Sequence, residues 1–185
     1  LSLRDNTTGV SNVSIGNFSL SKNTSGIRNV AVGESTLYNN TLGNRNTGLG
    51  QGALYKNTIG SYNTAVGHYA LLCNNTGARN SSLGARSMFS NTTGIENVAM
   101  GYDAMYYNIT GKSNTVIGYK AGPSSENTDL SNTIVIGSFA TATVSNTIVL
   151  GNYSILTSGG LKCNCTTITG LSDRRDKKNI IPFWI

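Results

Sequence analysis

The sequence of 185 residues has little charge, little proline and few large apolar side chains. Charged residues make up 12% of the chain, about half the usual share. The net charge of +6 comes mainly from basic residues scattered singly, with one dense group, Arg174–Lys178, interleaved with acidic side chains. This pattern argues against a nucleic-acid interface. No apolar run reaches the roughly 18 residues of a membrane span, so membrane insertion is not expected.

The residues that usually build catalytic or metal sites are also scarce. Three cysteines, Cys73, Cys163 and Cys165, are an odd number without metal-site spacing, so free thiols are expected, with pairing between chains as the alternative. His68 is the single histidine and occupies a variable repeat position. No pair of carboxylates recurs. We expect no metal, no cofactor and no enzyme active site.

What the sequence does have is a strict repeat of seventeen residues. Seven copies keep register without an insertion, which is typical of repeat architectures. One glycine column contains Gly16, Gly33, Gly50, Gly67, Gly84, Gly101 and Gly118, and another begins at Gly9 and Gly26. An asparagine column contains Asn12, Asn29, Asn46, Asn63, Asn80, Asn97 and Asn114.

Two apolar columns accompany these positions. One precedes the first glycines: Ile15, Val32, Leu49, Val66, Leu83, Met100 and Ile117. The other contains Leu20, Leu37, Leu54, Leu71, Met88 and Met105. Gly, Asn and Thr are poor helix formers, and the short segments between them are rich in β-branched residues. Each repeat therefore predicts one coil of an all-β, parallel β-solenoid (a β-roll or β-helix), with coils about 4.8 Å apart.

The stacked-coil arrangement predicts a structural role for each column. We expect the asparagines to form a hydrogen-bonded ladder, as in other stacked β structures. The aliphatic columns are expected to form a continuous inner seam. The glycines are expected to allow positive φ at corners or close backbone approach. The phrases that begin at Asn6 and Asn23 indicate turns, in which side-chain oxygens accept hydrogen bonds from nearby backbone N–H groups.

The period changes near residue 122, after which "SNTIVIG" (131–137) and "SNTIVLG" (145–151) recur fourteen residues apart. We interpret this as a tighter coil of the same solenoid. The expected organisation is seventeen-residue coils over 1–122, fourteen-residue coils over 123–160, a connector over 161–171 and a separate segment over 172–185. One thin coil encloses little core, so we also expect a homotrimer.

The fourteen-residue units resemble head repeats of trimeric autotransporter adhesins, which fold as trimeric parallel β-rolls. The seventeen-residue form is similar to repeats of phage and large-virus tail fibres. The likeness covers roughly residues 5–157. It implies a trimeric extracellular fibre.

"LSDRRDKKNI" (171–180) resembles the start of the intramolecular chaperone domain of phage tailspikes, endosialidase fibres and myelin regulatory factor. In that family a serine–lysine pair cuts the chain before the serine. The resemblance places the serine at Ser172, the aspartate at Asp173 and the lysine, as base, at Lys177. The family's chaperone continues well past this motif, so we expect 172–185 to be its truncated beginning. The alternative is a charged, solvated tail.

The sequence contains eleven N-x-S/T sequons: Asn6, Asn12, Asn17, Asn23, Asn39, Asn74, Asn80, Asn91, Asn108, Asn152 and Asn164. In a eukaryotic or viral protein many of them would be glycosylation candidates, whereas in a bacterial or phage protein they would be turn residues. Tyrosines at repeat positions, such as Tyr38 and Tyr55, would either pack between chains or stack on sugars.

The predicted function is a structural one: a shaft or tip segment of a trimeric virus or phage tail fibre, extracellular, that takes part in host attachment. Its partner would be a cell-surface glycan or protein receptor. The alternative is a cell-surface trimeric adhesin or a glycosylated extracellular filament with the same fold. A polysaccharide-degrading tailspike would need a fixed acidic cluster. The chain begins without methionine, so we expect it to be part of a longer protein.

Overall fold

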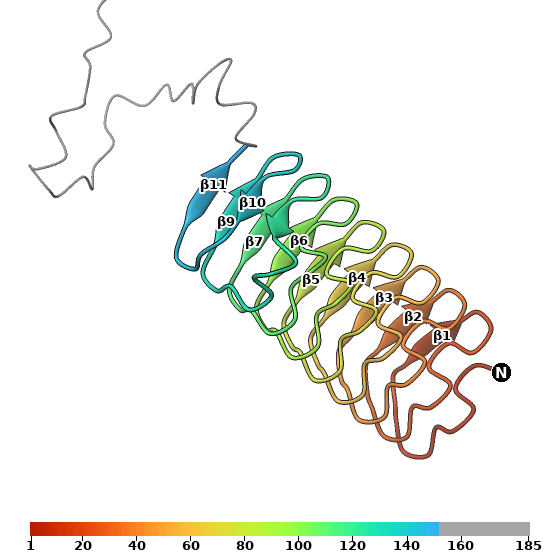
Figure 1. Cartoon of the computed structure of the whole chain (residues 1–185). Coiled ribbons are helices and arrows are strands. Elements are labelled where there is room, and N and C mark those ends of the chain that lie inside the picture. Colours follow the sequence, from red (N-terminus) through yellow and green to blue (C-terminus); the bar gives the residue numbers. More distant parts are fainter. Residues whose placement is uncertain (152–185) are drawn as a thin grey trace, which may run out of the picture.

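The structure is a computed structural model that describes residues 1–151, and these residues fold as the expected all-β parallel solenoid. Short strands joined by turns wind into coils that stack along one axis (Figure 1). No helix occurs within this range. The seventeen-residue period of the sequence is therefore the length of one coil.

The strands are β1 (Val13–Ile15), β2 (Val30–Val32), β3 (Thr47–Leu49), β4 (Thr64–Val66), β5 (Ser81–Leu83), β6 (Val98–Met100), β7 (Thr115–Ile117), β8 (Gly122–Pro123), β9 (Ile134–Ile136), β10 (Thr141–Ala142) and β11 (Ile148–Leu150).

One parallel sheet of nine strands runs the length of the stack in the order β1-β2-β3-β4-β5-β6-β7-β9-β11. Val13 pairs with Val30, seventeen residues on, and the same step holds to β7. Thr115 pairs with Ile134 across a longer coil, and Ile134 pairs with Ile148 across a fourteen-residue coil. The sheet thus continues unbroken through the change of period. β8 and β10 form a second, two-stranded parallel sheet.

The interior is narrow and continuous. The second apolar column of the sequence (Leu20, Leu37, Leu54, Leu71, Met88 and Met105) is fully buried, and we call it the inner column. The middle residue of each strand faces it, as with Ala31, Ala65 and Val116, which are also fully buried. Small residues in the strand opposite Leu or Met give a core of one side-chain layer per coil.

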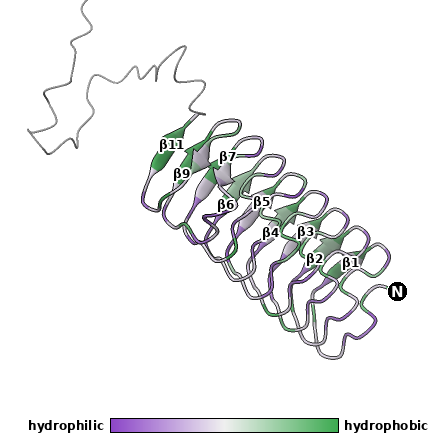
Figure 2. Ribbon diagram, in the orientation of Figure 1, coloured by the Kyte–Doolittle hydropathy of each residue, from purple (hydrophilic) through white to green (hydrophobic). Residues whose placement is uncertain are grey.

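The other apolar column, from Ile15 to Ile117, does not line the interior, so that part of the expected inner seam is wrong. Ile15 is 59% exposed, and Leu83 and Met100 are each 45% exposed. Successive side chains of a strand point to opposite faces, so a three-residue strand with its middle residue inward turns both ends outward. We call these residues the outer apolar column. Figure 2 shows the apolar colouring of β9 and β11, which continue this arrangement.

The glycine columns play both predicted roles. Gly67 has φ of +132°, a region that L side chains rarely adopt, and a Cβ there would lie 2.6 Å from the carbonyl oxygen of Gly84 in the next coil. Gly60, in the other column, would place a Cβ 2.5 Å from the carbonyl oxygen of Gly77. The backbones of neighbouring coils are therefore in contact at these corners, which excludes any side chain.

Each coil also contains left-handed residues that are not glycine. Arg28, Ser35 and Leu37 have φ of 57°, 56° and 52°. Such a backbone costs about 1 kcal/mol or more per residue. Hydrogen bonds to adjacent coils offset the cost: the Ser35 N–H donates to Asn17 (2.8 Å) and the Leu37 N–H donates to Ala53 (2.9 Å). A coil therefore keeps this conformation only within the stack.

Candidate functional site

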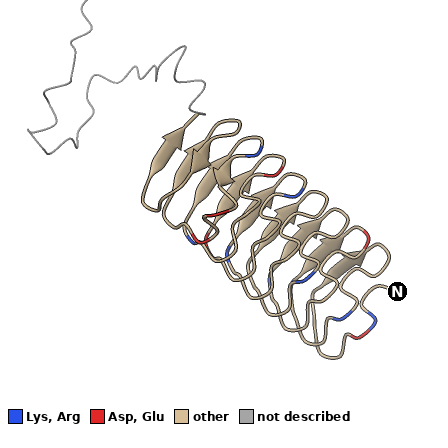
Figure 3. Cartoon of the chain, in the orientation of Figure 1, with Lys and Arg blue, Asp and Glu red and all other residues tan. Residues whose placement is uncertain are grey.

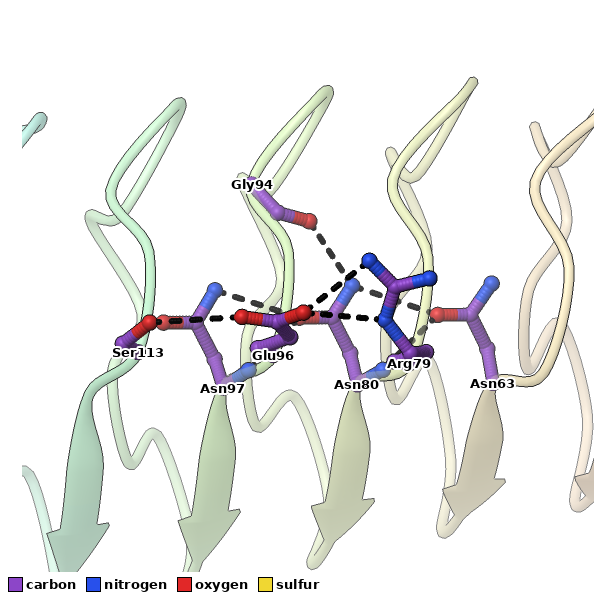
Figure 4. Close-up of polar contacts among 7 residues, drawn as sticks. All are labelled: Asn63, Arg79, Asn80, Gly94, Glu96, Asn97 and Ser113. Carbon is purple, nitrogen blue, oxygen red and sulfur yellow. Dashed lines mark hydrogen bonds and ion pairs between the residues drawn. The ribbon is translucent and has the colours of Figure 1, made fainter.

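The predicted asparagine column, Asn12 to Asn114, forms a ladder, which we call the first asparagine ladder. In Asn80 the side-chain oxygen accepts hydrogen bonds from the backbone N–H and the side-chain amide of Asn97, each at 3.1 Å. The Asn80 amide donates to the carbonyl oxygen of Gly94 at 2.8 Å (Figure 4). These side chains satisfy buried backbone groups at a corner, so their role is structural.

A second asparagine ladder was not predicted as one. It consists of Asn6, Asn23, Asn40, Asn57, Asn74, Asn91 and Asn108. The Asn57 amide donates to the side-chain oxygen of Asn40 at 2.8 Å and to the carbonyl oxygen of Gly60 at 2.9 Å. This local bond lies in a turn, where the sequence predicted one, but its direction differs from the prediction: the side-chain amide donates to a backbone carbonyl, whereas side-chain oxygens were expected to accept from backbone N–H groups. The seven-fold invariance of asparagine was the signal for the ladder between coils.

Most sequons of the described range coincide with these ladders. Asn23, Asn74, Asn80, Asn91 and Asn108 are fully buried. A sugar would attach to the amide nitrogen, which each of them uses to donate hydrogen bonds inside the stack. A glycan at any of these five positions is incompatible with the fold. Asn6, Asn12 and Asn39 are half-buried and donate similarly, whereas Asn17 is exposed.

Several sequence-predicted sites lie outside the described residues. They are the cleavage pair Ser172 and Lys177, the sequons Asn152 and Asn164, and Cys163 with Cys165. Self-cleavage before Ser172 stays a prediction. Within the described range, Cys73 is a half-buried free thiol, and His68 lies beside the ring of Tyr69. In residues 1–151 no three His, Cys, Asp or Glu side chains gather as metal ligands.

Charged residues lie on the turns, and none of the eleven strands of the described chain contains one (Figure 3). Three ion pairs occur in this part: Arg4–Asp5, Arg79–Glu96 and Arg86–Asp103. The hydrogen bond from Arg4 lowers the pKa of the exposed Asp5 carboxyl. Arg79 and Glu96 join consecutive coils beside the first ladder, as Figure 4 shows. Such exposed pairs contribute little to stability.

Aromatic side chains stack along the turns within a single chain. The rings of Tyr38 and Tyr55 are parallel at 5.2 Å, and those of Phe89 and Tyr106 at 5.0 Å. Tyr107 meets Tyr106 edge-on at 5.0 Å and is 46% exposed. These contacts cover part of each ring within the chain and leave the outer ring faces exposed to solvent.

A hollow opens where the period changes, and we call it the junction cavity. Its volume is about 470 Å³, and its lining includes Arg86, Asp103, Tyr106, Tyr107, Lys120 and Ser125. Thr141 of the following coil also lines the cavity, so four consecutive coils contribute to it. No motif of the sequence marked this place except the break in the repeat at Gly122-Pro123.

The outward side of the nine-stranded sheet exposes apolar side chains on successive strands. We call it the sheet face. Its exposed large side chains are Val13, Ile15, Leu49, Leu83, Val98, Met100, Ile117, Ile134, Ile136, Ile148 and Leu150. With nine strands about 4.8 Å apart, the strip is roughly 38 Å long. Monomeric proteins rarely expose a continuous apolar strip of this extent.

These features define the class of the molecule: it is an all-β solenoid repeat protein. In comparisons with protein-family models, curated proteins and solved structures, nothing matches this chain. Within residues 1–151 no helix is long and apolar enough to cross a membrane.

Proposed function

We propose that the chain is a shaft or tip segment of a trimeric virus or phage tail fibre that acts outside cells in host attachment. The single observation that carries the proposal is the sheet face. It extends along every coil, is uncharged, and keeps an apolar residue at the last position of all nine strands in coils of both lengths, whereas the first position is Thr or Ser in β3, β4, β5 and β7. The resemblance of the repeats to those of tail fibres and trimeric adhesin heads supports it.

A structural role fits the way the residues are used. The two asparagine ladders, the glycine columns and the inner column all hold one coil on the next. Each coil contacts mainly its neighbours, so the stack lengthens without changing its cross-section. A protein built in this way is suited to span distance, which is what a fibre does.

Association through the sheet face is the mechanical part of the proposal. The inner column gives each coil its own core, so the need for partners rests on the outer apolar column. The face presents similar side chains at every strand step. A second copy has the same spacing, and three copies packed by these faces remove them all from water.

The test is sedimentation analysis of the full chain and two variants. Met100→Asp puts a charge on the sheet face, where Met100 is 45% exposed. Thr93→Asp makes a comparable change on an exposed turn and serves as the control. We expect trimers for wild type and control, and for Met100→Asp a trimer dissociation constant at least ten-fold higher, because association would bury an unpaired charge. A wild-type chain that stays monomeric and folded at micromolar concentration contradicts the proposal.

Attachment is tested separately with the same proteins on immobilised host-cell glycans and surface proteins. A trimer presents three copies of any binding site, so its retention should exceed that of the dissociated variant by about 10²-fold. If neither form is retained on any surface, the chain is a spacer and the attachment role is wrong.

A further inference from the structure

We propose that the junction cavity binds an anionic sugar unit of a glycan. This inference rests on the attachment role proposed above and assigns it to one place on the molecule. Four features carry it: the origin of the hollow, its charge, its ring surfaces and its position relative to the sheet face.

The cavity exists because one coil lacks the bulky residues of the others. Gly122 and Pro123 stand seventeen residues after Met105 and Tyr106, where a buried apolar residue and an aromatic ring would be expected. Gly122 has φ of +135°, and a Cβ there would lie 2.9 Å from the Cα of Met105. The Gly122 backbone therefore occupies the space of the apolar side chain. Beside this turn, where Pro123 stands in place of a ring, lies a hollow of about 470 Å³, which is within the range of ligand sites.

The charge of the cavity is positive. Arg86 and Asp103 form an ion pair with Nε and Oδ1 2.9 Å apart, and they neutralise each other. Lys120 follows in the same column of the next coil, and among residues 1–151 no carboxylate lies within ion-pairing distance of it. Its ammonium lies 5.4 Å from the centre of the Tyr119 ring. An anionic group in the cavity would be the first full counter-charge for Lys120.

The ring surfaces favour a sugar over an acidic peptide. Tyr106 and Tyr107 both line the cavity and meet edge-on at 79°, and Tyr107 is 46% exposed, so an accessible aromatic surface borders the hollow. Arg86 lies 4.9 Å above the Tyr106 ring and fixes its orientation. The hydroxyls of Ser124 and Ser125 and the phenols supply hydrogen-bonding groups around this aromatic surface. A pyranose ring has an apolar C–H face and polar hydroxyl edges, which match such a lining.

The position of the cavity leaves it accessible in the assembled fibre. A Cβ at Gly122 would lie 3.6 Å from Cγ1 of Val116, so this turn packs across the core from β7. The cavity is therefore on the opposite side of the coil from the sheet face. Packing of three copies by their sheet faces would leave three such cavities open to solvent.

The experiment is binding of the full wild-type chain to an array of matched glycan pairs. Each pair has a glucuronate-, sialate- or sulfate-bearing member and its neutral parent, and a triglutamate peptide is included. We expect at least five-fold stronger binding to the anionic members of one sugar series, with no binding to triglutamate. Comparison of the carboxylated and sulfated series identifies the anionic group.

Variants then locate the site. Lys120→Asn removes the charge, and asparagine tolerates the left-handed φ of 52° at this position. Binding of the anionic members to this variant should fall to about the level of binding of their neutral parents. Lys112→Asn removes an exposed charge outside the cavity and should leave binding unchanged. Tyr107→Ala should weaken anionic and neutral members alike, because it removes part of the aromatic surface.

Three outcomes would overturn the inference: equal binding of charged and neutral members, a preference that survives Lys120→Asn, or triglutamate binding as strong as that of the best sugar. A preference lost equally in Lys120→Asn and Lys112→Asn would indicate general charge attraction and also overturn it. Glycan binding that is independent of Lys120 leaves the attachment role intact, whereas no binding by a trimer to any surface removes both.

Discussion

The seventeen-residue coils and the fourteen-residue coils share one sheet and a corner glycine but differ in the residues that fill the rest of the coil. Both place an apolar residue inward at mid-strand, Val116 in β7 and Val135 in β9, each fully buried. The long coils add the inner column and two asparagine ladders. After the last asparagine of the first ladder, Asn114, the same column continues with Thr133. The Thr133 hydroxyl donates a hydrogen bond to the side-chain oxygen of Asn114 at 2.7 Å.

The comparison shows which parts of a coil are required for stacking. The strand register and the corner glycine persist in both lengths, as in the pairing of Ile136 with Leu150 and the positive φ of Gly137. The turn side is variable, because residues there bond to backbone groups that a shorter turn does not present. Stacking therefore depends first on the sheet and corner, then on the ladders, and least on surface pairs.

The corner glycine should give the largest effect. Gly67→Ala forces a side chain into φ of +132° and to within 2.6 Å of the next coil, so we expect a loss above about 4 kcal/mol or no folded protein. Gly151→Ala is the matched control: φ is +82°, and no described atom lies within 4 Å of its Cβ. It should cost about 1 kcal/mol. Urea unfolding followed by circular dichroism measures both, and similar midpoints would contradict the packing at the corner.

The ladder should give an intermediate effect that separates the two kinds of coil. Asn80→Ala leaves the carbonyl of Gly94 and the backbone N–H of Asn97 without their buried partner, so we expect a loss of about 3 kcal/mol. Thr147→Ala changes the same column in a short coil, where Oγ1 donates to Val144 at an exposed site. It should cost about 0.5 kcal/mol.

Both ladder variants are measured in the same urea titration, at equal protein concentration because the assembly state affects the midpoint. If Asn80→Ala costs no more than Thr147→Ala, the asparagine side chains are not needed to satisfy the buried corner.

Much of the fold could be predicted from the period alone. Seven copies in register identify a stacked repeat, and the glycine and asparagine columns follow because only those residues fit the corner geometry of Gly67 and the bonding of Asn80. The orientation of the outer apolar column could not be predicted. A constant apolar column is expected both in a core and at an interface between chains, and periodicity does not distinguish them.

The junction cavity also could not be predicted from the sequence. It lies beside the turn at Gly122 and Pro123, where residues of four coils meet, so no single residue pattern encodes it. The left-handed backbone of residues such as Leu37 was unexpected, since leucine avoids that region when it is not held by neighbouring coils. The second asparagine ladder was visible as a column, but its local turn bond gave a sufficient explanation without contacts between coils.

The smallest effect concerns the column beside the first ladder, where one pair of long coils carries an ion pair and the short coils carry an amide pair. Arg79 Nη2 and Glu96 Oε1 are 2.9 Å apart, with both side chains about half exposed, whereas the amide of Asn132 donates to Asn146 at 2.9 Å. Glu96→Gln keeps the shape of the side chain and removes its charge, so the cost should be below about 0.5 kcal/mol. Glu34→Gln is the control, because Glu34 accepts from the Gln51 amide instead of a cation. The difference between the two variants should vanish in 1 M salt, where screening acts within about 3 Å. A cost above about 1 kcal/mol that persists in salt would mean that this column, and not only the ladders, holds the long coils together.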